Sequence, residues 1–157
     1  MAGSFCRQRK GQWAIVHVHC QMMEYKEKGG RSVIIGTGID IVDVSRMQRA
    51  LRNPLFVRRV FTGEEQVYCK GRGAQLAQSF AARYAAKEAV MKAFGVGIFQ
   101  GPFTDIEVVR LASGQPQLRL AGWFARRAAE MGVTAAHISL SHTREYATAS
   151  CILEGEP

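Results

Sequence analysis

The sequence lacks any hydrophobic run that approaches the ~18 apolar residues needed to cross a membrane. Its N-terminus has no apolar segment followed by a small-residue cleavage site, so we expect no secretory signal. Cysteine is also scarce: the chain contains only Cys6, Cys20, Cys69 and Cys151. Because none of them form a CxxC pair, a disulfide framework and a zinc site are both disfavoured. These absences predict a soluble, cytoplasmic protein that does not act at a membrane.

Acidic residues are few as well, with 13 Asp and Glu against 21 Lys and Arg and a formal charge of +8. After residue 41, arginines crowd one short stretch, namely Arg46, Arg49, Arg52, Arg58 and Arg59. A helix that buries Val44, Met47 and Leu51 would turn the first three of these arginines toward solvent. That face would attract an acidic partner, although a merely solvated basic face is the simpler alternative.

With 157 residues and 47% hydrophobic content, the chain is long enough for one domain with a real core. Residues 1–32 differ from the rest, because basic residues and glycines gather at both ends of the segment. We therefore expect a poorly ordered N-terminal extension over 1–32 and one domain over 33–157. The run His17, Val18, His19, Cys20 falls far short of a metal site.

A buried strand is predicted over residues 32–44, because the stretch is β-branched and nearly uncharged. Its alternation places Gly36, Gly38 and Asp40 on one face. The two glycines leave room for another backbone or a ligand to approach Asp40. The alternative is that Asp40 only ends the strand and accepts hydrogen bonds from loop amides. The pattern is not a dinucleotide fingerprint, since the third glycine is missing.

A long helix is predicted over residues 76–95, with an apolar stripe made of Leu76, Phe80, Tyr84, Met91 and Phe94. Lys87 lies inside that stripe and Glu88 flanks it, so two charges stand at the edge of a packed surface. In the alternative, these charges have only a structural role: Glu88 pairs with Lys92 one turn later, and Lys87 extends to water.

The remaining elements predict an α+β fold. A helix follows the first strand and stops near Asn53 and Pro54, and Thr62 with Glu65 has the spacing of a capping box. Later segments predict four strands and one helix, over 106–111, 117–120, 137–141, 146–153 and, for the helix, 124–131. Strands of this kind joined by short turns favour a largely antiparallel sheet packed against the long central helix.

The chain resembles the holo-acyl-carrier-protein synthase type of 4′-phosphopantetheinyl transferase from about Val33 to Leu153. The resemblance rests on GTGIDIVDVSRM, FTGEEQVY, FAARYAAKEAVMKAFGVGI, FTDIEVVRLASGQPQLRL and HISLSHTREYATAS, in this order and spacing. Two signatures of that family, GxDIxxxxR and FAxKEAxxKA, are specific when they occur together. The departure is the extension, because members of this type usually begin at the strand that holds Gly36.

The resemblance implies transfer of the 4′-phosphopantetheine arm from coenzyme A to a serine of an apo acyl carrier protein, which leaves holo carrier protein and 3′,5′-ADP. It also implies that Asp40 and Glu88 bind Mg²⁺, with water and phosphate oxygens as the other ligands. Glu88, directly or through a metal-bound water, is also the implied acceptor of the serine proton, and the sequence does not separate the role of base from that of ligand. Lys87 and Lys92 match lysines near the phosphates, and we give Lys92 the closer role.

The resemblance extends to the partners. Gly95 and Gly97 match a loop that accommodates coenzyme A, and Ser139, Ser141 and His142 match positions that border its nucleotide. For His142 a buried histidine at the end of a strand is a serious alternative. Arg46 matches the arginine that meets the carrier, and Arg49 lies on the same predicted face. Members of this size generally form trimers with shared active sites.

Two other functions compete with this interpretation. A nucleic-acid-binding module would need aromatic or hydrogen-bonding side chains between the arginines to read bases, and Phe56 is the only aromatic residue in 46–59. A pseudoenzyme would be expected to have lost part of the site, whereas both carboxylates and both lysines are present. We therefore expect an enzyme of lipid metabolism, in fatty acid biosynthesis, that uses neither nucleic acid nor a membrane. A polyketide carrier is the alternative to a fatty-acid carrier, and the sequence does not separate the two.

Overall fold

The structure is a computed structural model that describes residues 32–97 and 100–156. The predicted extension, apart from Ser32, and the histidines at 17 and 19 lie outside the described residues. None of the helices in the described ranges is long and apolar enough to cross a membrane.

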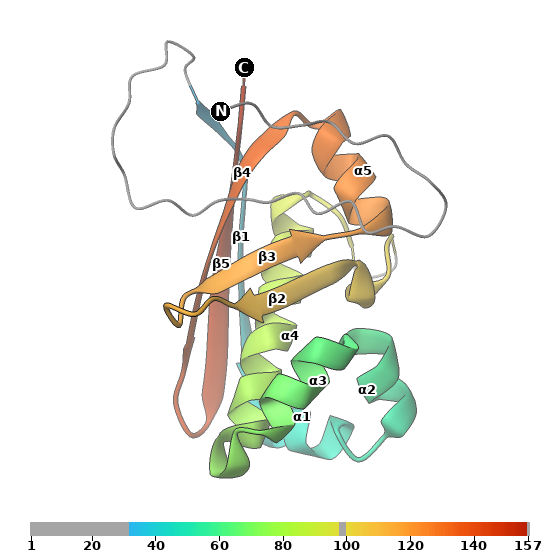
Figure 1. Cartoon of the computed structure of the whole chain (residues 1–157), viewed down its shortest axis with the longest axis vertical. Helices are drawn as coiled ribbons and strands as arrows, with labels where there is room; N and C mark the ends of the chain where they lie inside the picture. The colour runs from blue at the N-terminus through green and yellow to red at the C-terminus, as the bar shows by residue number, and fades with distance from the viewer. Residues whose placement is uncertain (1–31, 98–99, 157) are drawn as a thin grey trace.

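Three long strands form an antiparallel sheet in the order β1-β5-β4. Strand β1 spans Val33–Asp43, β4 spans Val133–His142 and β5 spans Tyr146–Gly155, which lies in the centre (Figure 1). Two shorter strands, β2 (Ile106–Arg110) and β3 (Pro116–Leu120), form a separate antiparallel hairpin. The predicted α+β class with antiparallel pairing is therefore confirmed.

Helix α4, Leu76–Ala93, runs along the inner face of the three-stranded sheet (Figure 1). The β2–β3 hairpin and helix α3 cover further sides of it, so α4 is buried around most of its circumference. The predicted single apolar stripe was too narrow, because alanines outside that stripe are buried too, such as Ala81, Ala85 and Ala89. Their small side chains let neighbouring elements approach the helix from several directions.

Gly36 and Gly38 set how closely β1 approaches α4. A Cβ atom at Gly36 would collide with the carbonyl oxygen of Ala93, and one at Gly38 would collide with that of Ala89. The expected close approach of a second backbone is therefore confirmed, and that backbone belongs to α4. As a result, the Asp40 side of β1 lies directly against the helix that carries Glu88.

Three short helices follow β1, and local capping explains where each begins. Helix α1, Val44–Ala50, starts at Asp43, whose carboxylate accepts a hydrogen bond from the Arg46 amide at 2.9 Å. Helix α2, Pro54–Val60, was not predicted, although Asn53 caps it and proline occupies its first turn. We had taken Asn-Pro only as a stop signal, whereas the same pair also begins a helix.

The predicted capping box is present at α3, Gly63–Lys70, where Thr62 and Glu65 exchange both hydrogen bonds. Short 3₁₀ turns precede α4 at Gly73–Gln75 and β2 at Phe103–Asp105. Helix α5, Gly122–Glu130, packs Phe124 and Ala128 into the core beside β4. Along α4, Tyr84 and Glu88 stay only partly buried and Lys92 is exposed, so one stripe of the helix remains open to solvent.

The outer face of the three-stranded sheet carries exposed apolar side chains. Ile39 is 68% exposed and Ile41 is 67% exposed, and Tyr146 and Ile152 also face outward. No element in the described ranges packs over these side chains. Isolated exposed apolar residues are normal, but a continuous apolar patch is a common mark of an interaction surface.

Candidate active site

Two carboxylates from distant parts of the chain meet where β1 passes α4. The Asp40 side chain points from β1 toward α4 and is only 11% exposed. Lys92 Nζ donates to Asp40 Oδ1 at 2.8 Å and to the carbonyl oxygen of Ile39 at 2.9 Å. The other carboxylate oxygen, Asp40 Oδ2, is buried without a hydrogen-bond partner in the described structure. The site thus holds a buried carboxylate oxygen without a hydrogen-bond partner among the described residues.

Glu88 is the second carboxylate. Burial raises the pKa of Glu88, and the nearby negative charge of Asp40 raises it further. A hydrogen bond with Tyr84 and the charge of Lys92 act in the opposite direction. The two carboxylates therefore occupy one partly desolvated space, in which Lys92 supplies positive charge.

Tyr84 is a site residue that the sequence pattern did not single out, because its spacing placed it in the apolar stripe. Its ring stacks on Phe103, with centroids 5.5 Å apart and planes 15° apart, and it also approaches Phe56 at 6.0 Å. Burial and the neighbouring Glu88 carboxylate raise the pKa of Tyr84 well above its usual range. The phenol therefore stays neutral and can donate to Glu88. The i,i+4 spacing of Tyr84 and Glu88 was the available signal.

Asp40 and Glu88 fit a hard divalent cation. The buried free oxygen of Asp40 and the mutual repulsion of the two carboxylates are the features that a cation would relieve. Among residues 32–97 and 100–156, no group of three or more His, Cys, Asp and Glu side chains could hold a metal. Two carboxylates with water and substrate oxygens suit Mg²⁺ better than a closed transition-metal site.

Lys87 is buried in the interior and does not extend to water. Its Nζ lies 2.7 Å from Glu65 Oε2, and both side chains are fully buried. The same ammonium donates to the carbonyl oxygens of Phe103 at 2.9 Å and Ile106 at 2.6 Å. The alternative in which Lys87 extends to water is therefore wrong, because α3 and β2 cover that side of α4. The alternative pair of Glu88 with Lys92 is not formed either, since Lys92 binds Asp40.

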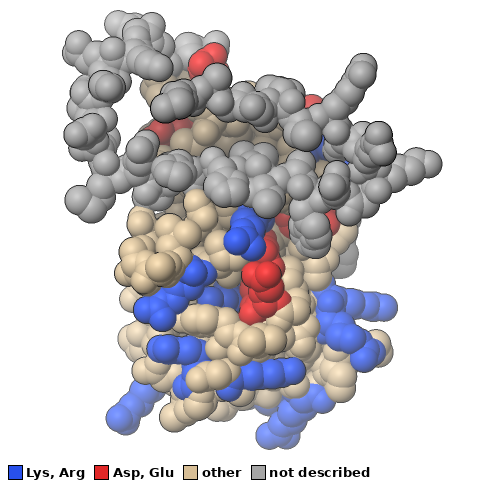
Figure 2. Space-filling view, in the orientation of Figure 1, with Lys and Arg blue, Asp and Glu red and all other residues tan. Residues whose placement is uncertain are grey.

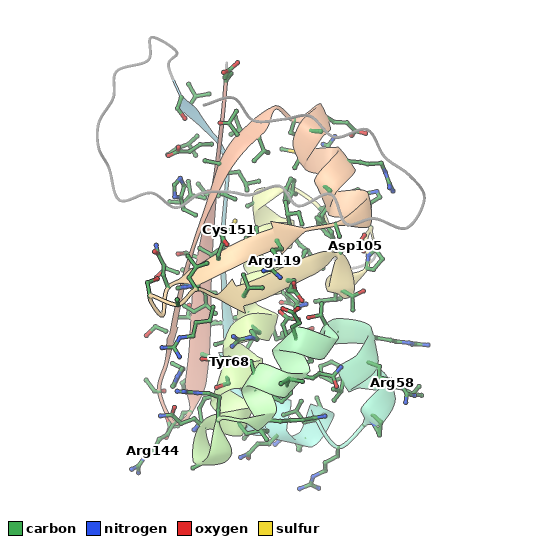
Figure 3. All side chains as sticks on the ribbon, viewed as in Figure 1. Arg58, Tyr68, Asp105, Arg119, Arg144 and Cys151 are labelled. Carbon is green, nitrogen blue, oxygen red and sulfur yellow. The ribbon has the colours of Figure 1, made fainter. Side chains whose placement is uncertain are left out.

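A cationic pocket of about 170 Å³ lies between α3, α4, the β2–β3 hairpin and the end of β4. Its basic lining residues are Arg72, Arg83, Arg110 and His142. Arg83 is nearly buried, its guanidinium lies 4.0 Å from the ring centroid of Tyr68, labelled on α3 in Figure 3, and its Nε has no partner among the described residues. Such a pocket suits an anion.

The three predicted nucleotide positions do not share one face. His142 is exposed and lines the cationic pocket, so the alternative of a buried histidine is wrong. Ser139 and Ser141 lie on the opposite, outer face of β4, because alternate side chains of a strand point to opposite sides. Arg83 was missed because its position on α4 looked like an ordinary polar interruption of the core pattern.

Gly95 and Gly97 follow α4 directly, one turn beyond Lys92. Gly95 has a φ of +67°, a left-handed conformation that ends the helix and that glycine adopts without strain. A side chain at Gly97 would meet nothing within 4 Å. Among the described residues, nothing therefore fills the space beside Gly97.

The basic face of α1 lies beside the carboxylates. Arg46 and Arg49 are exposed, as predicted, and the charge of Arg46 acts on the pKa of Tyr84, so it lies near the site. Arg49 reaches back to Ser45 Oγ at 3.2 Å. Figure 2 shows Lys and Arg side chains spread over the lower half of the molecule, where α1 to α3 lie.

Comparison with known protein families matches residues 36–151 to the 4′-phosphopantetheinyl transferase superfamily. This match spans more than half of the chain, and the chain therefore belongs to that superfamily. Its start near Gly36 agrees with the first strand of the described domain.

Individual relatives agree with the family. A holo-[acyl-carrier-protein] synthase from Geobacter metallireducens is 46% identical over 125 residues, which cover 78% of this chain and 98% of that protein. A holo-(acyl-carrier-protein) synthase from Bacillus anthracis, solved in complex with CoA (3′,5′-ADP), is 36% identical to this chain, with a TM-score of 0.66. The superposition covers 78% of this chain and 97% of that one. The acyl carrier protein synthase of Plasmodium yoelii with ADP bound has a TM-score of 0.72 at 28% identity. That superposition covers 82% of this chain and 100% of the Plasmodium chain.

Proposed function

We propose that this chain is a holo-acyl-carrier-protein synthase. It transfers the 4′-phosphopantetheine group from coenzyme A to a serine of an apo acyl carrier protein and releases 3′,5′-ADP. The observation that carries this proposal is that Asp40 and Glu88 lie together in a chain of this superfamily. The Oδ2 atom of Asp40 is buried there without a hydrogen-bond partner in the described structure. The relatives' name gives the carrier as an acyl carrier protein, and we place the reaction in fatty acid biosynthesis in the cytoplasm.

The chemistry is an in-line displacement at phosphorus. The serine Oγ forms a bond to the phosphorus that carries the pantetheine arm, and the bond from that phosphorus to the oxygen of 3′,5′-ADP breaks. Glu88 accepts the serine proton, and its raised pKa makes it a better base than an ordinary glutamate. Asp40 and Glu88 would hold Mg²⁺, which when bound offsets the negative charge of the pyrophosphate.

Lys92 provides positive charge for the leaving phosphate. Its side chain is 53% exposed, so the ammonium can turn from Asp40 toward a bound anion without leaving a buried cavity. The cationic pocket around Arg83 and His142 supports binding of the phosphorylated nucleotide of coenzyme A. The open loop at Gly95 and Gly97 provides room for the pantetheine arm.

The carrier and the neighbouring subunits fit two other surfaces. Arg46 and Arg49 offer positive charge next to Glu88, which suits an acidic carrier whose serine must reach that carboxylate. The apolar outer face around Ile39, Ile41 and Ile152 supports a homotrimer, in which the outer-face serines 139 and 141 would lie at a subunit boundary near shared active sites. Light scattering on the purified protein measures this assembly directly.

The decisive experiment mixes the protein with apo acyl carrier protein, coenzyme A and Mg²⁺ and follows the carrier by mass spectrometry. The carrier should gain one phosphopantetheine group, and only when the divalent ion is present. Asp40→Ala and Glu88→Ala should each abolish transfer while the fold persists, because each removes a cation ligand and not a core group.

Glu64→Ala is the matched control, since this carboxylate on α3 is 73% exposed and forms only a surface pair with Arg119. It should transfer at the wild-type rate. If several carriers keep their mass in the presence of the wild-type protein, the proposed activity is wrong.

A further inference from the structure

The interior between α3, α4 and β2 contains a fully buried ion pair, Lys87 with Glu65 at 2.7 Å. Such pairs add little net stability, because the loss of hydration offsets the attraction between the charges. Burial lowers the pKa of Lys87, and the Glu65 carboxylate opposes that shift. The pair is therefore poorly explained as a source of stability alone.

The pair joins three elements, and every donor of its ammonium is used. The three protons of the Lys87 ammonium match three acceptors, which are Glu65 and the carbonyl oxygens of Phe103 and Ile106. Glu65 in turn accepts from the Thr62 amide at 2.9 Å and from the Val108 amide at 3.0 Å. No donor of Lys87 is left for a phosphate.

Phe103 connects this pair to the active site. Its carbonyl oxygen accepts from Lys87, while its ring stacks on Tyr84 at 5.5 Å. Tyr84 lies one turn before Glu88 on α4, and its phenol interacts there with the Glu88 carboxylate. These contacts thus lead from the buried pair to Tyr84, which stands one turn from Glu88 on the same helix.

The stacking on Phe103 holds the Tyr84 ring, and with it the phenol, beside Glu88 on α4. A stacked ring has little rotational freedom, and its hydroxyl therefore presents a fixed donor. A hydrogen bond to a carboxylate is among the stronger ones in proteins.

We propose that Lys87 and Glu65 are positioning residues, which fix Glu88 through Phe103 and Tyr84, and that Lys87 does not touch the phosphates of coenzyme A. This inference rests on the proposed function. It replaces the role near the phosphates that the sequence implied for Lys87, and it adds Tyr84 and Glu65 to the residues on which the reaction depends.

The test compares Lys87→Met, Glu65→Gln and Tyr84→Phe. For each variant we would measure kcat, the KM for coenzyme A, the Kd for coenzyme A by calorimetry and the Kd for Mn²⁺ by electron paramagnetic resonance. A misplaced Glu88 should lower kcat by about tenfold or more and weaken Mn²⁺ binding. Coenzyme A affinity should stay within about twofold of wild type, because no phosphate contact is lost.

Further controls separate positioning from general damage. Glu64→Gln changes the adjacent, exposed carboxylate and should leave all four quantities unchanged. The double variant of Lys87→Met with Glu65→Gln should be no slower than the worse single variant, because both changes break one unit. If Lys87→Met fails to fold, Glu65→Gln and Tyr84→Phe still decide the matter, and Tyr84→Phe keeps the stacked ring.

Two results would overturn the proposal. One is a large rise in the coenzyme A Kd of Lys87→Met with kcat nearly unchanged, which would make Lys87 a phosphate ligand. The other is wild-type kcat and Mn²⁺ affinity in Tyr84→Phe, which would remove the last connection to Glu88. Both require an active wild-type protein, so they differ from a failure of the proposed function, in which the wild type itself transfers nothing.

Discussion

The close approach of β1 to α4 leads to a sharp prediction for Gly38→Ala. The new Cβ would lie 2.8 Å from the amide nitrogen of Ala93 and 3.0 Å from the carbonyl carbon of Ala89, and closer still to the carbonyl oxygen of Ala89. All of these atoms belong to the helix backbone, so no side chain can rotate away. The helix must therefore move away from the strand.

The size of the effect follows from that geometry. Overpacking a core costs about 1–3 kcal/mol, and we expect the upper end because only the backbone can respond. For a domain of this size, about 3 kcal/mol corresponds to a fall of roughly 10 °C in Tm. Glu88 precedes Ala89, so the same shift also separates it from Asp40, and a displacement of about 1 Å can cost roughly a hundredfold in kcat.

The assay is thermal unfolding together with transfer kinetics at saturating Mg²⁺. Gly63→Ala is the control, because a Cβ there meets nothing within 4 Å and the residue stands at the start of α3. It should match or slightly exceed wild-type stability. If Gly38→Ala and Gly63→Ala have the same Tm and the same kcat, α4 does not pack on β1 as described.

Four more predictions follow from particular side chains. The pKa of Glu88 in the fold is raised above its ordinary value of 4.5, so the unfolded chain loses this proton at lower pH than the fold does, and the metal-free fold loses stability as pH rises from the ordinary pKa to the raised one. Glu88→Gln should therefore increase the Tm at pH 7 without metal. An equal or lower Tm would contradict this. Arg46→Glu should raise the KM for the carrier but not for coenzyme A, and the penalty should shrink with salt, since screening acts over ~8 Å at physiological ionic strength. A penalty independent of salt would refute docking by exposed charge. Deletion of residues 1–31 should leave kcat and Tm nearly intact, because the family match begins at residue 36, and a large loss of either would show that the segment supports the domain. Burial raises the pKa of Cys69 to about 11 and that of Cys151 to about 12, so a thiol reagent at pH 8 should label neither in the folded protein, and labelling as fast as in denaturant would disprove their burial.

Local chemistry explains which elements could be predicted. The Thr62 and Glu65 capping box and the face shared by Gly36, Gly38 and Asp40 depend on residues within a few positions of one another, and both were correct. The error at Asn53 and Pro54 was also local, because one pair of residues can end one helix and begin the next. Predictions failed mainly where a partner came from far along the chain.

Lys87 shows why such partners stay hidden. An ammonium on a helix either reaches water or finds acceptors, and the choice depends on what covers that side of the helix. Here Glu65 lies 22 positions earlier, and the acceptor carbonyl groups of Phe103 and Ile106 lie 16 and 19 positions later. Neither periodicity nor charge spacing encodes that meeting.

By itself, the sequence determined the fold class and the basic face of α1, because residue type, period and capping act over short distances. Its resemblance to a known family singled out the two carboxylates and two lysines of the signatures. Only the tertiary structure decided that Lys92 binds Asp40 while Lys87 is buried against Glu65, that Tyr84 reaches Glu88, and that His142 joins Arg83 in a cationic pocket. The physical reason is that burial and pairing of a charge depend on the elements packed around it, and those elements meet only when the sheet, α3 and the hairpin close around α4.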